Sequence, residues 1–265
     1  MEAESPRQQK TGKAQTPFDN GELYDAIFGD LDYDRTFYVE LAREARGPVL
    51  EVACGTGRIL IPCLEAGVEV DGIDLFPSML EMLKRKAKAR GLNPRVQAGD
   101  MRDFTLPHRY DLIFIAFNGF VHALTSEDQL KTLRVCREHL LTGGMLVFNI
   151  FFPGLEYLSG KEGVPVLETE SVHPRTGWKL RVFDTRTFDR VEQVQHSRIE
   201  IHELDPEDRA AVIHVSETDM RWTFKHEMQL LLQLAGFQRW ELCGGFDRRS
   251  LARESDLFIV FAWRD

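Results

Sequence analysis

The order of predicted elements between Pro48 and Phe152 constrains this chain more than any other feature of its sequence. Apolar runs in this stretch are expected to form strands buried on both faces, and they lie at 49–53, 68–73, 110–117 and 145–152. Apolar residues at helical spacing occupy 77–90, and Thr125 opens a second helix that is expected to close at Gly143-Gly144. Strand, turn and helix therefore alternate, which predicts a parallel sheet with helices on its faces and right-handed crossovers.

The pattern changes after Pro153. Polar and apolar residues alternate in 164–222, and turn-forming segments at 173–177 and 205–209 interrupt the alternation. This predicts an antiparallel sheet inserted into the first domain. The α/β order then resumes with a helix at about 225–235 and strands near 238–242 and 257–263.

Composition narrows the classes of function. The chain has 265 residues, of which 43% are hydrophobic, so it can bury the core of one large domain or of one domain with an insertion. Its formal net charge of −9 makes nucleic acid and anionic membranes poor partners. The four cysteines and eight histidines lack the spacing of a disulfide framework or a zinc site, which favours a reducing, cytoplasmic location and no metal.

The first sixteen residues are polar and lack the apolar stretch of a secretory signal. We therefore predict a mobile, disordered tail over residues 1–16. No run elsewhere approaches the ~20 apolar residues that a membrane-spanning helix needs.

The stretch 49–57 (VLEVACGTG) ends a predicted strand in a glycine-containing turn. Gly55 and Gly57 are expected to let a ligand approach the backbone closely. Asp74 follows at the end of the next predicted strand, where a carboxylate can accept both hydroxyls of a ribose. These features alone also fit an NAD-dependent oxidoreductase.

Two details separate the alternatives. The position three residues beyond Gly57 holds Leu60 rather than the Gly or Ala of a dinucleotide-binding loop, so the turn suits a pyrophosphate less well. Gly99-Asp100-Met101 lies where a third strand should end, and there an Asp can bond an adenine amino group while Met packs against the ring. A helix N-cap is the alternative role for Asp100.

These three turns, at 51–57, Asp74 and 99–101, resemble in order and spacing the ligand-binding turns of the class I S-adenosylmethionine-dependent methyltransferases. The resemblance runs from about Tyr24 to the C-terminus and is greatest to the dTDP-amino-sugar N,N-dimethyltransferases and the glycine and sarcosine N-methyltransferases. It implies S-adenosylmethionine as the cofactor. It also implies a Rossmann-like α/β fold, with a seven-stranded, mostly parallel sheet, an inserted antiparallel sheet and an N-terminal helical lid.

The resemblance divides the chain into parts. Residues 17–46 are expected to form the helical lid, 47–160 together with 223–265 the cofactor-binding α/β domain, and 161–222 the inserted antiparallel part. The inserted sheet has one apolar face, which can pack on the α/β domain or against a second copy in a homodimer.

The resemblance also implies a set of site residues. Those expected to bind the cofactor are Tyr33, Ala53, Gly55, Gly57, Asp74, Leu75, Met79, Asp100, Met101 and Phe117. His122 and Tyr24 are expected at the methyl acceptor, either as a base or as groups that only orient it. A structural histidine and a lid aromatic that merely packs are the alternative roles of these two residues.

The predicted activity is methyl transfer to a small molecule at an amine nitrogen, by in-line displacement. The alternatives are O-methylation of a small molecule, a non-catalytic protein that binds S-adenosylmethionine, and the NAD-dependent oxidoreductase. A methyltransferase of nucleic-acid bases fits less well, because that family has Asn or Asp followed by Pro-Pro and an aromatic where this chain has Ala116-Phe117-Asn118-Gly119. Nothing in the sequence names the acceptor.

Overall fold

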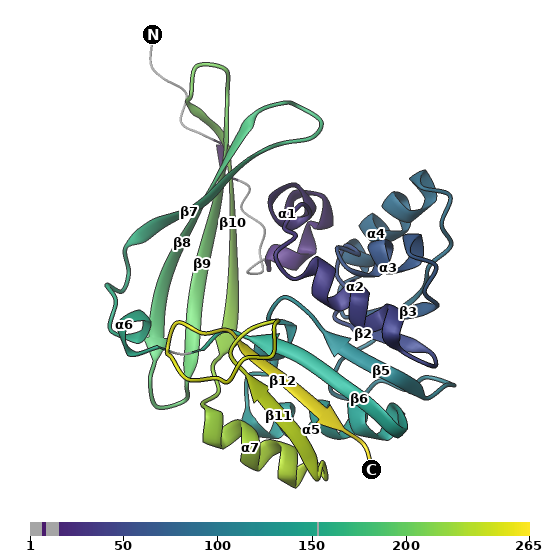
Figure 1. Ribbon diagram of the computed structural model, residues 1–265. Coiled ribbons are helices and arrows are strands. Elements are labelled where there is room, and N and C mark those ends of the chain that lie inside the picture. Colours follow the sequence, from purple (N-terminus) through teal and green to yellow (C-terminus); the bar gives the residue numbers. More distant parts are fainter. Residues whose placement is uncertain (1–6, 9–15, 153) are drawn as a thin grey trace.

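The computed structural model describes residues 7–8, 16–152 and 154–265, which build two sheets (Figure 1). The larger sheet has seven strands in the order β11-β12-β6-β5-β2-β3-β4. Its strands are β2 (Val49–Val52), β3 (Val70–Asp74), β4 (Arg95–Ala98), β5 (Tyr110–Ile115), β6 (Leu140–Ile150), β11 (Arg239–Cys243) and β12 (Phe258–Trp263). Strands β2 to β6 pair in parallel, whereas β12 is antiparallel to both of its neighbours. The predicted seven-stranded, mostly parallel sheet is confirmed.

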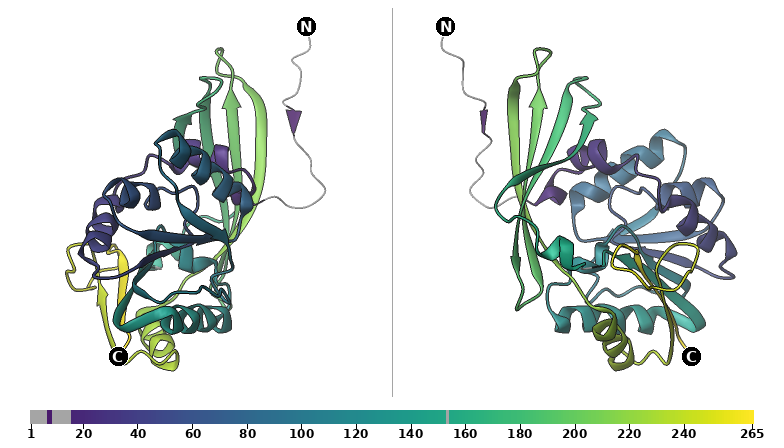
Figure 2. Two further views of the ribbon diagram at one scale, coloured as in Figure 1. Left: turned by 90° about the vertical axis from the view of Figure 1, so that its right-hand side faces the viewer. Right: turned by 60° about the vertical axis from the view of Figure 1, so that its left-hand side comes forward.

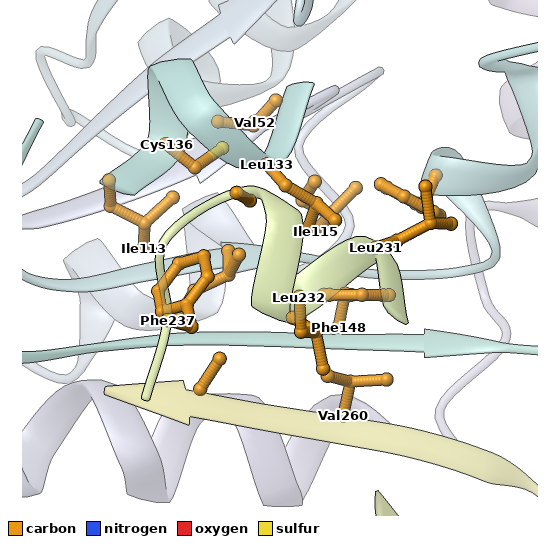
Figure 3. Packing of buried hydrophobic residues seen from close by; sticks show 14 of the residues in the cluster. Val52, Ile113, Ile115, Leu133, Cys136, Phe148, Leu231, Leu232, Phe237 and Val260 are labelled. Carbon is orange, nitrogen blue, oxygen red and sulfur yellow. The ribbon is translucent and has the colours of Figure 1, made fainter. Parts of the chain in front are cut away.

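Helices cover both faces of this sheet because its strands are apolar on both sides. Ile113 and Ile115 of β5 belong to one core cluster, and Leu112 and Phe114 belong to the other. The first cluster packs under α5 (Ser126–His139) and α7 (Lys225–Leu234), as Figure 3 shows for Leu133, Leu232 and their neighbours. The second lies under α2 (Arg35–Glu44), α3 (Leu60–Glu65) and α4 (Pro77–Ala89).

The first turns of two of these helices carry the residues that favour helix starts. Thr125 precedes α5, and its side chain accepts a hydrogen bond from the Asp128 N–H. Pro77 occupies the first position of α4, where its missing N–H costs no helical hydrogen bond.

The predicted end of α5 at Gly143-Gly144 is wrong. The helix ends at His139, and the glycines lie within β6, where the pairing with β5 shifts in register. Arg264 caps the helix there in place of a glycine, since its Nη1 lies 3.2 and 3.1 Å from the Arg137 and Glu138 carbonyls of the last turn and 2.6 Å from that of Leu140, the first residue of β6.

The second sheet has the order β1-β10-β9-β8-β7. Its strands are β1 (Arg7–Gln8), β7 (Pro165–Val172), β8 (Lys179–Asp189), β9 (Val194–Leu204) and β10 (Ala210–Arg221). Strands β7 to β10 form an antiparallel meander, which confirms the predicted antiparallel sheet, and β1 pairs in parallel with β10. Residues 1–6 and 9–15 of the predicted tail lie outside the described residues.

The N-terminal helices connect the two sheets. α1 (Gly21–Phe28), which follows the 3-10 turn η1 (Pro17–Asp19), lies between the second sheet and α4 (Figures 1 and 2). Leu23 and Ile27 of α1 pack against Leu180, Val182 and Ile201 of the second sheet. We call the face of the second sheet that carries these three residues its inner face.

Two ion pairs hold the N-terminal helices to the α/β part. The Asp25 carboxylate of α1 binds Lys86 Nζ of α4 and accepts a hydrogen bond of 2.6 Å from the Thr56 hydroxyl. Asp34, just before α2, makes a two-pronged pair with the Arg58 guanidinium. In the described parts of the chain, no helix is long and apolar enough to cross a membrane.

Candidate active site

A cavity of about 420 Å³ lies where the parallel strands of the larger sheet end at their carboxyl ends. Such an edge is the usual ligand site of open α/β sheets. Turns after β2, β3, β4 and β5 form its floor, and η1, α1 and β10 close it from the other side. The predicted site residues that line it are Tyr24, Ala53, Gly55, Asp74, Leu75, Met79, Asp100, Met101, Phe117 and His122.

The glycine loop after β2 opens toward this cavity at Gly55. The residue has a φ of +53°, and a Cβ built on it would meet no protein atom within 4 Å. Its N–H donates a hydrogen bond of 2.8 Å to Asp74 Oδ2, so the loop is tied to the end of the neighbouring strand. Backbone and space at Gly55 therefore suit a ligand that lies directly against the loop.

Two predicted cofactor residues do not line the cavity. Gly57 has a φ of +83°, and a Cβ there would come within 2.8 Å of Leu83 Cγ, so this glycine permits packing of the loop on α4 rather than ligand approach. Tyr33 is 49% exposed, and its ring centroid lies 6.3 Å from that of Phe117 and 6.0 Å from the Arg58 guanidinium.

Asp74 is held with both carboxylate oxygens oriented. Oδ2 accepts the Gly55 N–H, and Oδ1 accepts the Phe76 N–H at 2.9 Å. Burial raises the pKa of this carboxyl above its ordinary value, against the lowering effect of the two backbone donors. Each oxygen retains further acceptor capacity, so the carboxylate fits the two hydroxyls of a ribose.

Asp100 lines the cavity after β4 and also stabilises its own turn. Its Oδ1 accepts hydrogen bonds of 2.9 Å from the Arg102 backbone N–H and from Arg102 Nε. This contact with the guanidinium lowers the pKa of the Asp100 carboxyl, which is therefore ionised at neutral pH. Oδ2 accepts from Arg102 Nε and Nη2 as well, so Arg102 occupies both oxygens and Asp100 acts here as the cap of its own turn, the alternative role that the sequence left open.

Aromatic rings form much of the cavity wall. The Phe18 ring centroid lies 5.1 Å from those of Phe76 and His122 and 5.8 Å from that of Tyr24. The sequence analysis missed Phe76, although it belongs to the same turn as Asp74, and missed Phe18, for which no local pattern gives a signal. Aromatic faces attract cations, so this wall favours a sulfonium ligand.

His122 lies in the 3-10 turn η2 (Gly119–His122) that follows β5. Its Nδ1 is 3.1 Å from the Asp219 backbone oxygen, and because a carbonyl only accepts, Nδ1 carries the proton. Burial lowers the pKa of the imidazole below 6.5, so the ring is neutral at pH 7 with a lone pair on Nε2. Tyr24 is a neutral phenol, since burial raises its pKa well above 10.

The charge of the cavity is predominantly negative. The carboxylates of Asp74 and Asp100 lie on its floor, whereas the Asp219 carboxylate pairs with His196 at 2.8 Å. The Arg102 guanidinium also lines the cavity, but it is paired with Asp100 and, at 3.4 Å, with Asp128. A pyrophosphate would meet net repulsion here. Sequence analysis missed Glu217, Thr218 and Asp219, because only the tertiary fold brings β10 to this edge.

Comparisons with known proteins show which domain family and fold this chain resembles. A family model described as a methyltransferase domain matches residues 49–144. The chain is 31% identical over 130 residues to the putative methyltransferase YqeM of Bacillus subtilis (strain 168), a match that covers 48% of this chain and only about half, 52%, of that protein.

Two relatives match over a larger share of the chain. Cypemycin N-terminal methyltransferase of Streptomyces sp is 25% identical over 213 residues, which cover 80% of this chain and 81% of that protein. A dTDP-3-amino-3,6-dideoxy-alpha-D-glucopyranose N,N-dimethyltransferase of Streptomyces fradiae is 25% identical over 214 residues and 78% of each chain.

A solved structure shows the same fold. The S-adenosylmethionine-dependent methyltransferase from Clostridium acetobutylicum ATCC 824 superposes with a TM-score of 0.73 at 18% identity, covering 91% of this chain and 96% of that chain. Residues 49–144 therefore form the methyltransferase domain of an S-adenosylmethionine-dependent enzyme, and the chain as a whole has the class I methyltransferase fold. Within that class its distant relatives include the dTDP-amino-sugar enzymes, as predicted. The resemblance to glycine and sarcosine N-methyltransferases stays a prediction.

Proposed function

We propose that this protein transfers the cofactor's methyl group to an amine nitrogen of a small molecule. The observation that carries the proposal is one cavity that joins the Asp74 and Asp100 turns to the neutral imidazole of His122. The first two residues suit the sugar and base of the cofactor, and His122 stands at the opposite, acceptor side of the β5 turn. Tyr24 and Phe117 line the space with them.

The residues around the cavity divide cofactor binding, exclusion of water and proton acceptance among them. Asp74 accepts hydrogen bonds from the ribose hydroxyls, and Asp100 accepts one from the adenine amino group. S-adenosylmethionine supplies an electrophilic methyl on a positively charged sulfur. Phe18, Tyr24 and Phe117 exclude water from the reacting groups. As the N–C bond forms and the C–S bond breaks, His122 Nε2 or water takes the proton that the amine releases.

The partner of His122 favours nitrogen over oxygen as the acceptor atom. Its Nδ1 donates to a backbone carbonyl rather than to a carboxylate, and burial keeps the pKa of the ring lowered despite the nearby Asp219 charge. An alcohol must lose its proton as it attacks and needs a strong base, whereas a neutral amine attacks with its own lone pair. The names of the two relatives with the longer matches, an N-terminal methyltransferase and an N,N-dimethyltransferase, also support nitrogen.

The test compares matched amines and alcohols as acceptors. Purified protein is incubated with S-adenosylmethionine and with 3-amino-3-deoxy-D-glucose or D-glucose, and the products are measured by mass spectrometry. We expect a mass gain of one or two methyl groups on the amine only, with one S-adenosylhomocysteine formed per methyl. Methylation of D-glucose instead would establish the O-methyltransferase alternative. Cofactor binding without turnover on a wider panel of amines would favour the non-catalytic alternative.

A further inference from the structure

One buried amide connects the turn after β5 to the N-terminal part of the chain. Asn149 of β6 is 2% exposed and is the polar residue of an otherwise apolar stretch, 145–152. Its Oδ1 accepts a hydrogen bond of 3.1 Å from the Phe117 N–H and one of 2.8 Å from the Tyr38 hydroxyl. Because a backbone N–H only donates, the atom that faces Phe117 is the amide oxygen. Both lone pairs of this oxygen are thus used by residues 32 and 111 positions away in the chain.

The turn that Asn149 holds has an uncommon backbone conformation. Phe117 and Asn118 follow each other with φ values of +52° and +60°, a left-handed region that residues other than glycine rarely adopt. Such a pair persists only where its surroundings fix it, and it is typical of functional sites. Without the acceptor on Asn149, the Phe117 N–H would lose its partner and the pair would relax toward a commoner conformation.

This turn carries groups from two sides of the cavity. Phe117 lines the cavity, and the Arg58 guanidinium lies 4.8 Å from the centre of its ring. The 3-10 turn η2 begins at Gly119 and brings His122 to the cavity three residues later. A shift of the backbone at Phe117 therefore moves the cavity wall and the His122 imidazole together.

Tyr38 carries the contact to helix α2. It is fully buried, and its ring stacks on that of Phe114 with centroids 5.1 Å apart. Burial raises the pKa of its phenol well above 10, so the hydroxyl keeps its proton and donates it to Asn149. The ion pair of Asp34 with Arg58 fixes the beginning of the same helix. Helix α2 is therefore held to the α/β part at two points, one of which is the amide that holds the β5 turn.

We infer that Asn149 is a positioning residue for methyl transfer, and that Tyr38 couples helix α2 to the same turn. Neither side chain lines the cavity, so both act through Phe117 and His122 rather than on a ligand. The effect through Phe117 concerns the cofactor and needs no acceptor. The effect through His122 rests on the proposed N-methyltransferase function.

The first experiment follows cofactor binding and the turn itself. Calorimetry measures affinity for S-adenosylhomocysteine, and NMR of protein labelled with ¹⁵N-phenylalanine measures hydrogen exchange of the Phe117 amide relative to the Phe114 amide of β5. Asn149→Leu removes the acceptor at similar size, and we expect about tenfold weaker binding and at least about tenfold faster relative exchange. Asn149→Asp keeps an oxygen in place and should restore both values to within about threefold of wild type. Wild-type values in Asn149→Leu, or equal losses in both variants, would overturn the inference.

Two buried tyrosines give a matched comparison that holds even if Asn149→Leu does not fold. Tyr38→Phe removes the hydroxyl that donates to Asn149. Tyr110→Phe removes an equally buried residue's hydroxyl, which donates to Asp71 at 2.9 Å from the opposite end of β5. Urea denaturation should show a similar loss of stability in both variants, whereas only Tyr38→Phe should weaken S-adenosylhomocysteine binding, by about threefold. Equal affinity in the two variants would mean that the Tyr38 hydroxyl is purely structural and would overturn the coupling to α2.

Turnover with 3-amino-3-deoxy-D-glucose separates this inference from the proposed function. We expect kcat to fall about tenfold in Asn149→Leu, by less in Tyr38→Phe and not at all in Tyr110→Phe. If no amine is methylated but the differences in binding and exchange appear, the N-methyltransferase proposal fails and the positioning role stands. If all variants methylate the amine alike and bind S-adenosylhomocysteine alike, the positioning role fails and the proposed function stands.

Discussion

The two sheets of this protein build their ends of the site in different ways. At the edge of the seven-stranded sheet, short turns fix the cofactor residues, and the Gly55 N–H and the Asp74 carboxylate are joined by a direct hydrogen bond. On the inner face of the second sheet, residues far apart in sequence meet only through strand register, as Thr218, Ser197 and Arg186 do. We therefore expect the cofactor end to be specified locally and the acceptor end by tertiary structure, because only the fold brings β10 to the cavity.

The largest expected effect concerns the cofactor end. Asp74→Ala removes an acceptor of two ribose hydrogen bonds and leaves two backbone N–H groups without their partner, so affinity for S-adenosylhomocysteine should fall by at least about 100-fold. Isothermal titration calorimetry measures this, with the exposed Asp103→Ala as the control. Unchanged affinity would show that Asp74 does not bind the cofactor. The turns at the edge of the larger sheet would then no longer be the cofactor site.

The next effect concerns the junction of the two regions. His122→Ala should lower kcat by about tenfold or more, and Tyr24→Phe by less, while affinity for S-adenosylhomocysteine stays within about twofold. Steady-state kinetics with an amine acceptor and calorimetry on the same samples give both values. Wild-type turnover in either variant would take that residue out of the active site.

The two glycines of the loop offer a sharper test within the cofactor end. Gly57→Ala should lower the free energy of unfolding by about 1–3 kcal/mol, because the methyl group meets Leu83 and the φ is positive. Gly55→Ala meets no protein atom and should cost about 1–2 kcal/mol of backbone strain, yet it should weaken cofactor binding more. Urea denaturation measures the free energy of unfolding of each variant, and calorimetry measures its affinity for the cofactor. Equal loss of cofactor affinity in both would mean that Gly57 also contacts the ligand.

The smallest expected effect is on the dependence of turnover on pH, whose acid limb should lie below the pKa of an ordinary histidine. The folded protein holds the pKa of His122 below 6.5, and the neutral ring is the form that accepts a proton. Turnover should therefore be constant near pH 7 and fall only below pH 6.5 as the imidazole is protonated. Folding stability falls in the same direction, because the unfolded chain binds that proton more readily. A limb of the kcat profile above pH 7 that is absent in His122→Gln would contradict this assignment.

Sequence reasoning predicted the larger sheet well because strands buried on both faces appear as unbroken apolar runs. The runs at β2, β3, β5 and β12 lie within one or a few residues of their predicted positions. It failed at Gly143-Gly144, where a side chain distant in sequence, Arg264, replaces the expected glycine cap. The predicted limits of the helical lid and of the inserted part stay predictions.

In the candidate site too, the residues next to strand ends could be predicted from the sequence, whereas those brought in by the tertiary fold could not. Asp74 and Asp100 each follow a strand end directly, so their meeting at one sheet edge could be foreseen. The loop's own sequence does not reveal that Gly57 faces Leu83 rather than the cavity, because that depends on how α4 packs. No local pattern marks Phe18 or Asp219 either. These residues reach the cavity from the chain's beginning and from β10.

The hydrogen bond from His122 to the Asp219 carbonyl has a consequence for engineering the enzyme's range of acceptors. A backbone oxygen of β10 in the second sheet decides which nitrogen of the His122 imidazole, in the turn after β5, keeps its lone pair. Replacing the second sheet with that of another methyltransferase would therefore exchange more than the lining of the acceptor pocket. If the new sheet had no backbone carbonyl in the place of Asp219, the His122 ring could adopt its other tautomer. We expect such a chimera to bind the new acceptor but to transfer its proton less well.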